Sequence, residues 1–243
     1  SADTEAYLLK KKHDNTKSLD LLTVTKNICN IDLLNLWKKN IIIFKNRQII
    51  LAFEFCCRLI SRSDRHSVKL FANFEYYYLF NNFNCSIQFD KKDNEILEKF
   101  YKKNNFKINQ KFICIHNRDN LYHEKNLEEL DLSYHSHRNF EIFNLATATE
   151  FISKFKYKII RMGQESSQKL DNKSSIIDYS NSSSRNNLLD LLLISKCNFY
   201  VGCDSGLWGV ALLFRKPIVW TNMTSIINLQ IVNGGQTVSS IYA

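Results

Sequence analysis

The feature that most constrains the fold is a regular alternation of short apolar runs and helical segments after residue 110. Runs of four to eight apolar residues are typical of strands that are buried on both faces, as in a parallel sheet. Strands and helices that alternate along the chain indicate a Rossmann-like unit, with helices on both sides of that sheet. We therefore expect an α/β fold. The expected strands lie in FICIH (112–116), YKIIRMG (157–163), SIIDYS (175–180), NFYVGC (198–203) and KPIVWTN (216–222).

The first half of the chain alternates helix and strand signals less regularly. We expect helices in DTEAYLLKKK (3–12) and NIDLLNLWKKN (30–40, with Asn30 as N-cap), a strand in SLDLLTV (18–24), and buried segments in QIILAFEFCCRLI (48–60) and FANFEYYYLFNNF (71–83). A helix over 93–103 ends in a polar, Asn-rich turn at 104–110. The sequence thus predicts two lobes, residues 1–105 and 106–243.

Composition excludes several classes of protein. A hydrophobic content of 44% with 13% aromatic residues excludes a disordered chain, and no apolar run approaches the roughly 20 residues of a membrane span. The seven cysteines are irregularly spaced, which indicates reduced, buried thiols in a cytosolic protein rather than a zinc site or disulfides. The net charge of +9 favours anionic partners, namely nucleotides, acidic lipids or nucleic acid.

Polar side chains collect where each strand of the second half ends. Because ligands of open α/β sheets bind at the carboxyl ends of the strands, these residues predict a binding site. In chain order they are His116 and Arg118, then Arg161 and Gly163, then Asp178 and Tyr179, and finally Asp204, Ser205, Gly206 and Leu207.

Two of these strand ends have chemistry suited to phosphate. His116 and Arg118 are two residues apart, so both side chains can emerge on the same side of the chain, and a guanidinium group matches phosphate oxygens. GCDSGLWGV (202–210) lacks both the GxGxxG fingerprint and the GxxxxGK[ST] loop, but its turn opens a helix whose free N–H groups suit a phosphate. The alternatives are a structural ion pair for Arg118 and close helix packing for the glycines.

The sequence offers little support for a metal or a nucleophile. His135 and His137 precede Arg138 and Asn139 in SYHSHRNF, but no third ligand has suitable spacing, and there is no DxD motif. Cys203 follows an apolar strand without a nearby histidine, which is typical of a packed thiol. We expect no metal and no cofactor.

Several segments in combination resemble a family of bacterial GT-B-type glycosyltransferases associated with surface-polysaccharide genes. FICIHNRD, HSHRNFEIF, YKIIRMG, IIDYS, LLLISKCNFYVGCDSGL and KPIVWTN are similar to the C-terminal half of that family, and DTEAYLL and ICNIDLLNLWKKN to its N-terminal portion. The HxR element, which runs from His116 to Arg118, resembles the donor-phosphate motif of fucosyltransferase-like enzymes. The DSG turn resembles the donor-binding turn of heptosyltransferases.

The resemblance implies two Rossmann-like lobes with parallel sheets, an acceptor side in residues 1–105 and a nucleotide-sugar side in 106–243, with the donor in the cleft between them. It also implies metal-independent transfer of a sugar to a glycan or lipid-linked acceptor, with Arg138 and Asn139 among the donor-binding residues. Asp3 and Glu5 are the candidate bases if the enzyme inverts the anomeric centre. The expected location is the cytoplasm at the inner face of the membrane, with peripheral contact to acidic lipid and no nucleic acid.

The same resemblance implies a chain that is trimmed at both ends, because the family has a strand and a Gly-containing loop before the position of Asp3 and further chain after that of Ala243. Two alternatives remain open. One is a nucleotide-sugar epimerase on the same fold, and the other is a basic nucleic-acid-binding module. Basic groups that converge in one cleft would favour the transferase, and a continuous exposed basic stripe with aromatics would favour nucleic acid.

Overall fold

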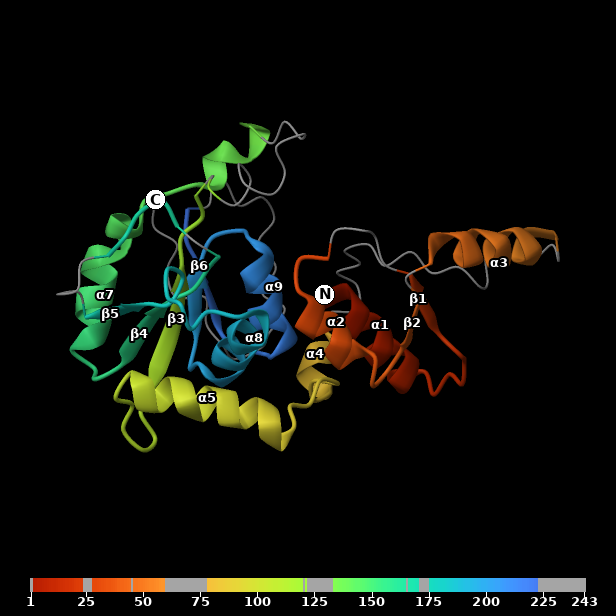
Figure 1. Ribbon diagram of the computed structural model, residues 1–243, viewed down its shortest axis with the longest axis horizontal. Coiled ribbons are helices and arrows are strands. Elements are labelled where there is room, and N and C mark those ends of the chain that lie inside the picture. The colour runs from red at the N-terminus through yellow and green to blue at the C-terminus, as the bar shows by residue number, and fades with distance from the viewer. Residues whose placement is uncertain are drawn as a thin grey trace. The chain divides into compact units, whose positions relative to one another are not determined.

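The computed structural model describes residues 2–23, 28–44, 46–59, 78–119, 121, 133–164, 166–170 and 175–222. The chain divides into two compact units, unit 1 (Ser1–Phe89) and unit 2 (Asp90–Ala243). This division lies 16 residues before the boundary that the sequence predicted at 105/106. The two boundaries differ because helix α5 (Lys91–Lys103) belongs to unit 2, where it packs against helix α8 (Figure 1).

Unit 1 contains a small parallel sheet of two strands within the described residues. The predicted helix at 3–12, the strand at 18–24 and the helix capped by Asn30 are confirmed, and the Asn30 side chain accepts a hydrogen bond from the Leu33 N–H. The prediction of a Rossmann-like lobe is not clearly established in this unit. Its elements are α1 (Ala2–His13), β1 (Leu21–Thr23), α2 (Ile31–Trp37), β2 (Ile42–Phe44), α3 (Arg47–Leu59) and α4 (Leu79–Asn82).

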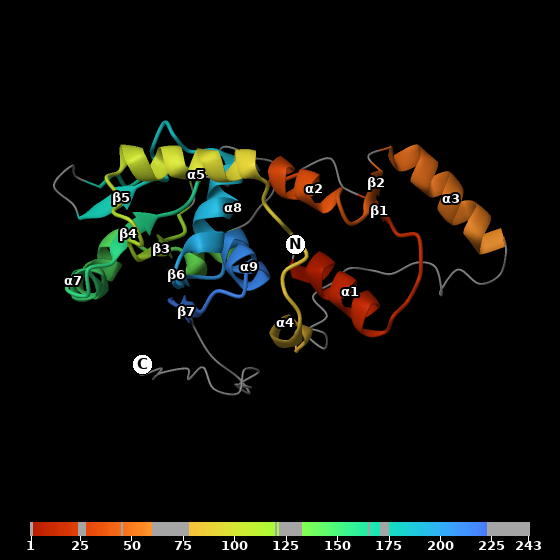
Figure 2. The same cartoon turned by 90° about the horizontal axis from the view of Figure 1, so that it is seen from below.

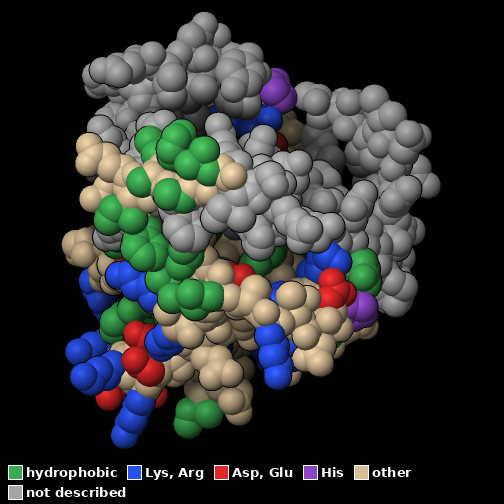
Figure 3. Space-filling model, turned by 90° about the vertical axis from the view of Figure 1, so that its right-hand side faces the viewer, with side chains coloured by type: hydrophobic (Ala, Val, Ile, Leu, Met, Phe, Trp, Pro, Cys, Tyr) green, Lys and Arg blue, Asp and Glu red, His purple; other side chains and the backbone are tan. Residues whose placement is uncertain are grey.

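The prediction that residues 48–60 form a buried segment is wrong for the side chains that the structure describes there. Helix α3 exposes Ile49 and Leu51 at 52% each, Phe55 at 63% and Leu59 at 69%. Figure 3 shows hydrophobic side chains gathered on the surface of unit 1 over this helix. In the aromatic segment 71–83, Leu79 and Phe80 are buried as expected, whereas residues 71–77 lie outside the described part of the chain.

Unit 2 is built on one parallel sheet with the strand order β5-β4-β3-β6-β7. All five strands coincide with the apolar runs that predicted them, so the α/β class and the parallel sheet are confirmed. Besides α5, the elements are β3 (Phe112–His116), η3 (Ser133–Arg138), η4 (Ile142–Leu145), α7 (Ala146–Ser153), β4 (Lys158–Arg161), β5 (Ile176–Asp178), α8 (Asn187–Lys196), β6 (Tyr200–Gly202), α9 (Gly206–Leu213) and β7 (Ile218–Trp220).

Helices cover both faces of this sheet. Figure 2 shows α7 against one face and α8 and α9 against the other, with α5 beside α8. Successive residues of β3 point to opposite faces, so Ile113 and Ile115 pack under η4 and α7 while Cys114 faces α8. Helix α8 packs against both α5 and α9, which explains why it is buried on nearly all sides, from Leu189 through Ile194. No described helix is both long enough and apolar enough to cross a bilayer.

The cysteines are less uniformly buried than the sequence indicated. Cys114, Cys197 and Cys203 are buried in unit 2, as expected of packed thiols. Cys29 and Cys56 of unit 1 are exposed, which corrects the prediction for these two residues. Cys29 lies two residues before α2, and Cys56 lies in α3.

Candidate functional site

The carboxyl edge of the unit 2 sheet has a topological switch point between β3 and β6. The chain runs from β3 outward to β4 and β5, returns to β6 on the other side of β3, and continues to β7. His116 pairs with Gly202 at the end of these two central strands. The chain continues from β3 and from β6 to opposite sides of the sheet, and ligands of open α/β sheets bind at such a switch point.

A cluster of charged side chains lies at this switch point. The Arg138 guanidinium forms an ion pair with Asp204 (3.1 Å), and both side chains are partly exposed, at 30% and 46%. Burial, and then the positive charge of Arg138, lower the pKa of Arg118, so the two guanidinium groups repel each other. Asp204 therefore holds Arg138 near Arg118 against their mutual repulsion.

The turn after β6 presents the start of α9 to the same place. Ser205 is the N-cap residue in extended conformation, but its side chain makes no capping hydrogen bond to the helix. Gly206 is exposed, and a Cβ built there would meet no atom within 4 Å. The first turn, including Gly206 and Leu207, thus carries the positive end of the helix dipole beside open space.

The segment that carries Arg138 is anchored to the end of β7. The Asn222 side-chain amide donates to the backbone carbonyls of His137 (2.9 Å) and Asn139 (3.3 Å). Asn222 itself adopts a positive φ of 55°, a conformation that asparagine tolerates better than most residues. The Phe140 N–H donates to the Arg118 carbonyl (3.1 Å), which ties the same segment to β3.

His116 and Gly202 form the floor of the switch point rather than its lining. A Cβ at Gly202 would lie 2.9 Å from the His116 carbonyl oxygen, so the close approach of two strands requires glycine here. The His116 Nδ1 lies 3.0 Å from the Met162 carbonyl oxygen, and burial of the ring lowers the pKa of His116 to about 4. Gly163 has a positive φ of 139° and lies against this ring. The close approach of His116 therefore explains the glycine at position 202.

The ends of β4 and β5 use their polar groups internally. The Arg161 side chain is fully buried. Its guanidinium donates to Asn117 Oδ1 (3.0 Å), to Ser166 Oγ (2.6 Å) and to the Gln168 carbonyl, and it lies 3.5 Å from Asp178. The structure therefore gives Arg161 a structural role and leaves it no exposed surface for a donor.

Asp178 and Tyr179 belong to the same internal network. Asp178 accepts hydrogen bonds from the Ser180 hydroxyl (2.7 Å) and the Asn181 amide (2.9 Å). Tyr179 is fully buried, and its ring packs edge-on against Phe100. Of the residues predicted to bind a donor, the structure brings together Arg118, Arg138, Asn139, Asp204, Ser205, Gly206 and Leu207. Around another centre it buries Arg161 and Tyr179 and partly buries Asp178.

The candidate bases lie in α1 of unit 1. Glu5 is completely buried, and its Oε1 accepts a hydrogen bond from the Ser86 N–H (3.0 Å). A carboxylate in that position is shielded from any acceptor hydroxyl. Asp3 is only partly buried, in the first turn of the same helix.

Among the residues that the structure describes, no three His, Cys, Asp or Glu side chains are grouped to hold a metal ion. The His135 side chain lies outside the described part. Burial raises the pKa of the Cys203 thiol, which disfavours the nucleophilic thiolate near neutral pH.

Two tryptophans at the site were missed from the sequence. The Trp208 Nε1 donates to Asp204 (2.9 Å), and its ring lies 5.0 Å from that of Trp220 at the end of β7. The spacing of four residues between Asp204 and Trp208, at the start of a helix, is the signal that indicates the first contact. Pairing of β6 with β7 brings Trp220 into place, which is a non-local event.

Comparison with known proteins supports the fold. No protein-family model and no curated protein sequence matches the chain. Among solved structures, the chain is similar to a glycosyl transferase family 9 protein from Veillonella parvula, with a TM-score of 0.52 and 12% sequence identity. The match covers 89% of this chain and 75% of that one. At this identity, the likeness shows an α/β fold with parallel sheets that is similar to that of the family 9 protein.

Proposed function

We propose that the protein is a glycosyltransferase that binds the diphosphate of a nucleotide-sugar donor at the β3–β6 switch point. The observation that carries the proposal is the convergence of Arg118, Arg138 and the start of α9 at that point. The fold similarity to a family 9 glycosyltransferase supports the same reaction class.

The charges suit a diphosphate leaving group. In glycosyl transfer, an acceptor oxygen forms a bond to the anomeric carbon while the bond from that carbon to the diphosphate oxygen breaks. Negative charge develops on the departing diphosphate, and fixed positive groups there lower the barrier. Two guanidinium groups and the N-terminus of α9 supply such charge, and the open space at Gly206 lets phosphate oxygens approach the backbone N–H groups.

The acceptor proton must pass to a base, and we assign acceptor binding to unit 1. Asp3 is the candidate base that we retain, since Glu5 is enclosed and hydrogen-bonded to the Ser86 backbone. An Asp3→Asn variant should then bind donor normally but transfer slowly. We propose a glycan or a lipid-linked sugar as the acceptor class.

A matched pair of glycine variants tests the phosphate site. Gly206 and Gly209 lie in the same helix, and a Cβ at either position meets no atom within 4 Å, so neither valine variant has a packing reason to unfold. We expect Gly206→Val to abolish binding of nucleoside diphosphates in calorimetric titration, because its side chain fills the phosphate space. Gly209→Val, one turn further on, should bind as the parent does. Equal binding by the two variants would contradict the site.

A turnover assay tests the reaction. When a panel of nucleotide sugars is tried, one of them should release nucleoside diphosphate, and only when an acceptor is present. The release should continue in excess chelator. Isomerisation of the donor sugar without transfer would instead identify an epimerase. Loss of activity in chelator, with recovery on adding magnesium or manganese, would contradict the metal-independent mechanism.

A further inference from the structure

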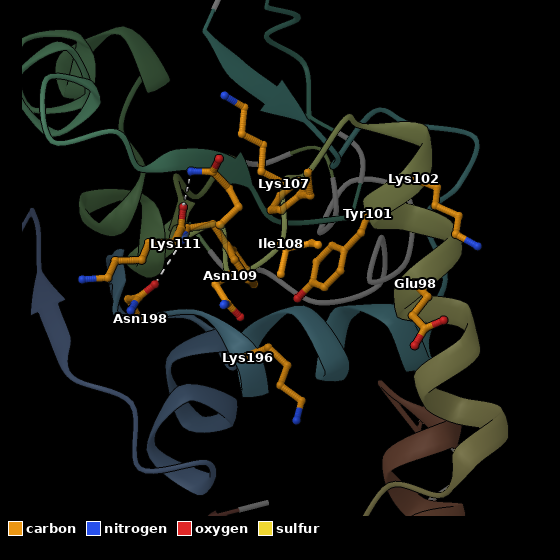
Figure 4. Close-up of a pocket in the computed structure, with 12 residues that line it drawn as sticks. Glu98, Tyr101, Lys102, Lys107, Ile108, Asn109, Lys111, Lys196 and Asn198 are labelled. Carbon is orange, nitrogen blue, oxygen red and sulfur yellow. Dashed lines mark hydrogen bonds between the residues drawn. The ribbon is translucent and has the colours of Figure 1, made fainter.

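The opposite, amino edge of the unit 2 sheet carries a surface that the donor site does not use. An open groove of about 560 Å³ lies between the end of α5, the loop 104–111 and the end of α8. Of the 12 residues that line it, four are lysines and one is a glutamate, Glu98. Figure 4 shows the lysine side chains extending outward around a centre that contains Tyr101 and Ile108.

Ile108 is 95% exposed at the tip of this loop, although the loop itself is firmly held. The Gln110 side-chain amide donates to the Lys156 carbonyl (2.7 Å), and the Lys158 ammonium donates to the Asn105 carbonyl (2.9 Å) and lies over the Phe106 ring. These contacts hold the turn in place, so the turn itself keeps the Ile108 side chain exposed.

The turn after α7 adds apolar surface on the same side. The Gln110–Lys156 hydrogen bond places the 154–156 turn beside the loop, and Figure 1 shows the end of α7 and the loop at the same edge of the sheet. Phe155 is 61% exposed and Phe151 59%. We call this surface the amino-edge face, and define it by Lys102, Lys107, Ile108, Lys111, Phe155 and Lys196.

We propose that the amino-edge face docks the protein on a membrane surface that contains anionic lipid. Exposed apolar side chains surrounded by lysines match the boundary between acyl chains and acidic headgroups, where apolar tips insert and ammonium groups meet phosphate. Stacking of nucleic-acid bases fits less well. Tyr101 and Phe106 stack on each other (4.7 Å between ring centroids), and both are partly buried.

Vesicle co-sedimentation at 0.15 M salt tests the proposal, with phosphatidylcholine vesicles that contain 30% phosphatidylglycerol. The parent protein should bind these vesicles and should bind pure phosphatidylcholine far less. Replacement of Lys102, Lys107 and Lys196 by glutamine should lower the partition coefficient about 100-fold, since each lysine near an acidic surface contributes roughly a factor of five.

A second set of variants separates this face from net charge alone. Lys91, Lys92 and Lys169 are also exposed in unit 2 but lie away from the face, so their replacement by glutamine changes the net charge equally and should have only a small effect. Ile108→Ser should reduce binding about tenfold or more without changing the melting temperature. In an Ile108→Trp variant, the fluorescence emission of the added tryptophan should shift to shorter wavelength when the protein binds anionic vesicles, because the ring enters an apolar environment.

Three results would overturn the proposal: equal loss of binding in the two lysine triples, an unaffected Ile108→Ser variant, or equal binding to neutral vesicles. Binding of a single-stranded oligonucleotide through the same lysines, without vesicle binding, would assign the face to nucleic acid instead.

Discussion

The two halves of the carboxyl edge of the unit 2 sheet carry similar residues but use them differently. At the β3–β6 half, Arg118 and Arg138 lie together and partly exposed beside the start of α9. At the β4–β5 half, Arg161 is enclosed by the loop that follows it, which supplies Ser166 and Gln168 as acceptors. Arg161 is thus used inside the protein, whereas Arg118 and Arg138 stay partly exposed and remain ligand candidates.

The largest expected effect is on stability, in the enclosed half. Arg161→Leu removes the partner of Asp178 and of the Asn117 and Ser166 side chains, and leaves the largely buried Asp178 carboxylate, which is 17% exposed, without this cation. We expect the free energy of unfolding to fall by about 3–5 kcal/mol, as for other broken buried ion pairs. Urea unfolding measures it.

The control for that variant is Arg118→Leu, at the open half, which should lose less than about 1 kcal/mol. Similar losses in the two variants would erase the distinction between the halves.

The next effect is on binding, in the open half. Arg118→Ala should weaken the binding of nucleoside diphosphate by about 1.5–3 kcal/mol, the range for a hydrogen bond to a charged group. Its melting temperature should stay close to that of the parent. Unchanged affinity in calorimetric titration would remove Arg118 from the donor site.

His116 lies between the two halves and predicts a dependence of stability on pH. Its pKa is about 4 in the folded protein, below the 6.5 of an unperturbed histidine, because burial disfavours the charged ring. The unfolded chain therefore binds the proton first as the pH falls. The stabilisation is complete above about pH 6.5 and declines toward pH 4, by about 2 kcal/mol at pH 5.

Urea unfolding at pH 8 and pH 5 tests this effect in the parent and in His116→Gln. The difference between the two pH values should be about 2 kcal/mol smaller in the variant. An identical pH dependence would show that the ring is not protected from protonation.

The smallest expected effect is on stability, at Gly209 of α9. Gly209→Ala should raise the free energy of unfolding by about 0.5–1 kcal/mol, because alanine favours a helix and the new Cβ meets no atom within 4 Å. The open space at Gly209 argues against close helix packing as the explanation of this glycine. Destabilisation of the Gly209→Ala variant in thermal unfolding would restore the packing explanation.

Much of the fold of unit 2 was predictable because its signals are local. The apolar runs at 112–116 and 198–203 identify central strands by their own residues, since both faces of such strands are covered. The strand-end rule then placed Arg118 and Asp204 at one edge. The positions of Ser205 and Gly206 at the start of a helix also followed from a short stretch of sequence.

The division into units and the exposure of α3 depend on contacts between residues that are far apart in the sequence. The sequence of helix α5 does not show whether the helix ends the first lobe or begins the second. Its packing against α8, some 90 residues later in the chain, assigns it to unit 2. The apolar residues of α3 indicated burial, but burial requires a covering surface, and the described residues leave Phe55 and Leu59 exposed.

The sequence by itself determined the order of strands and helices in unit 2 and the collection of polar groups at one edge of a parallel sheet. Only the tertiary structure decided which of those groups are buried and which stay partly exposed at that edge. Arg118 and Arg161 both follow apolar strands and could not be separated by residue type or spacing. The physical reason is that burial depends on distant partners: Asn117 lies 44 residues from Arg161, and its side chain helps to enclose that guanidinium, whereas Arg138 stays partly exposed in its ion pair with Asp204.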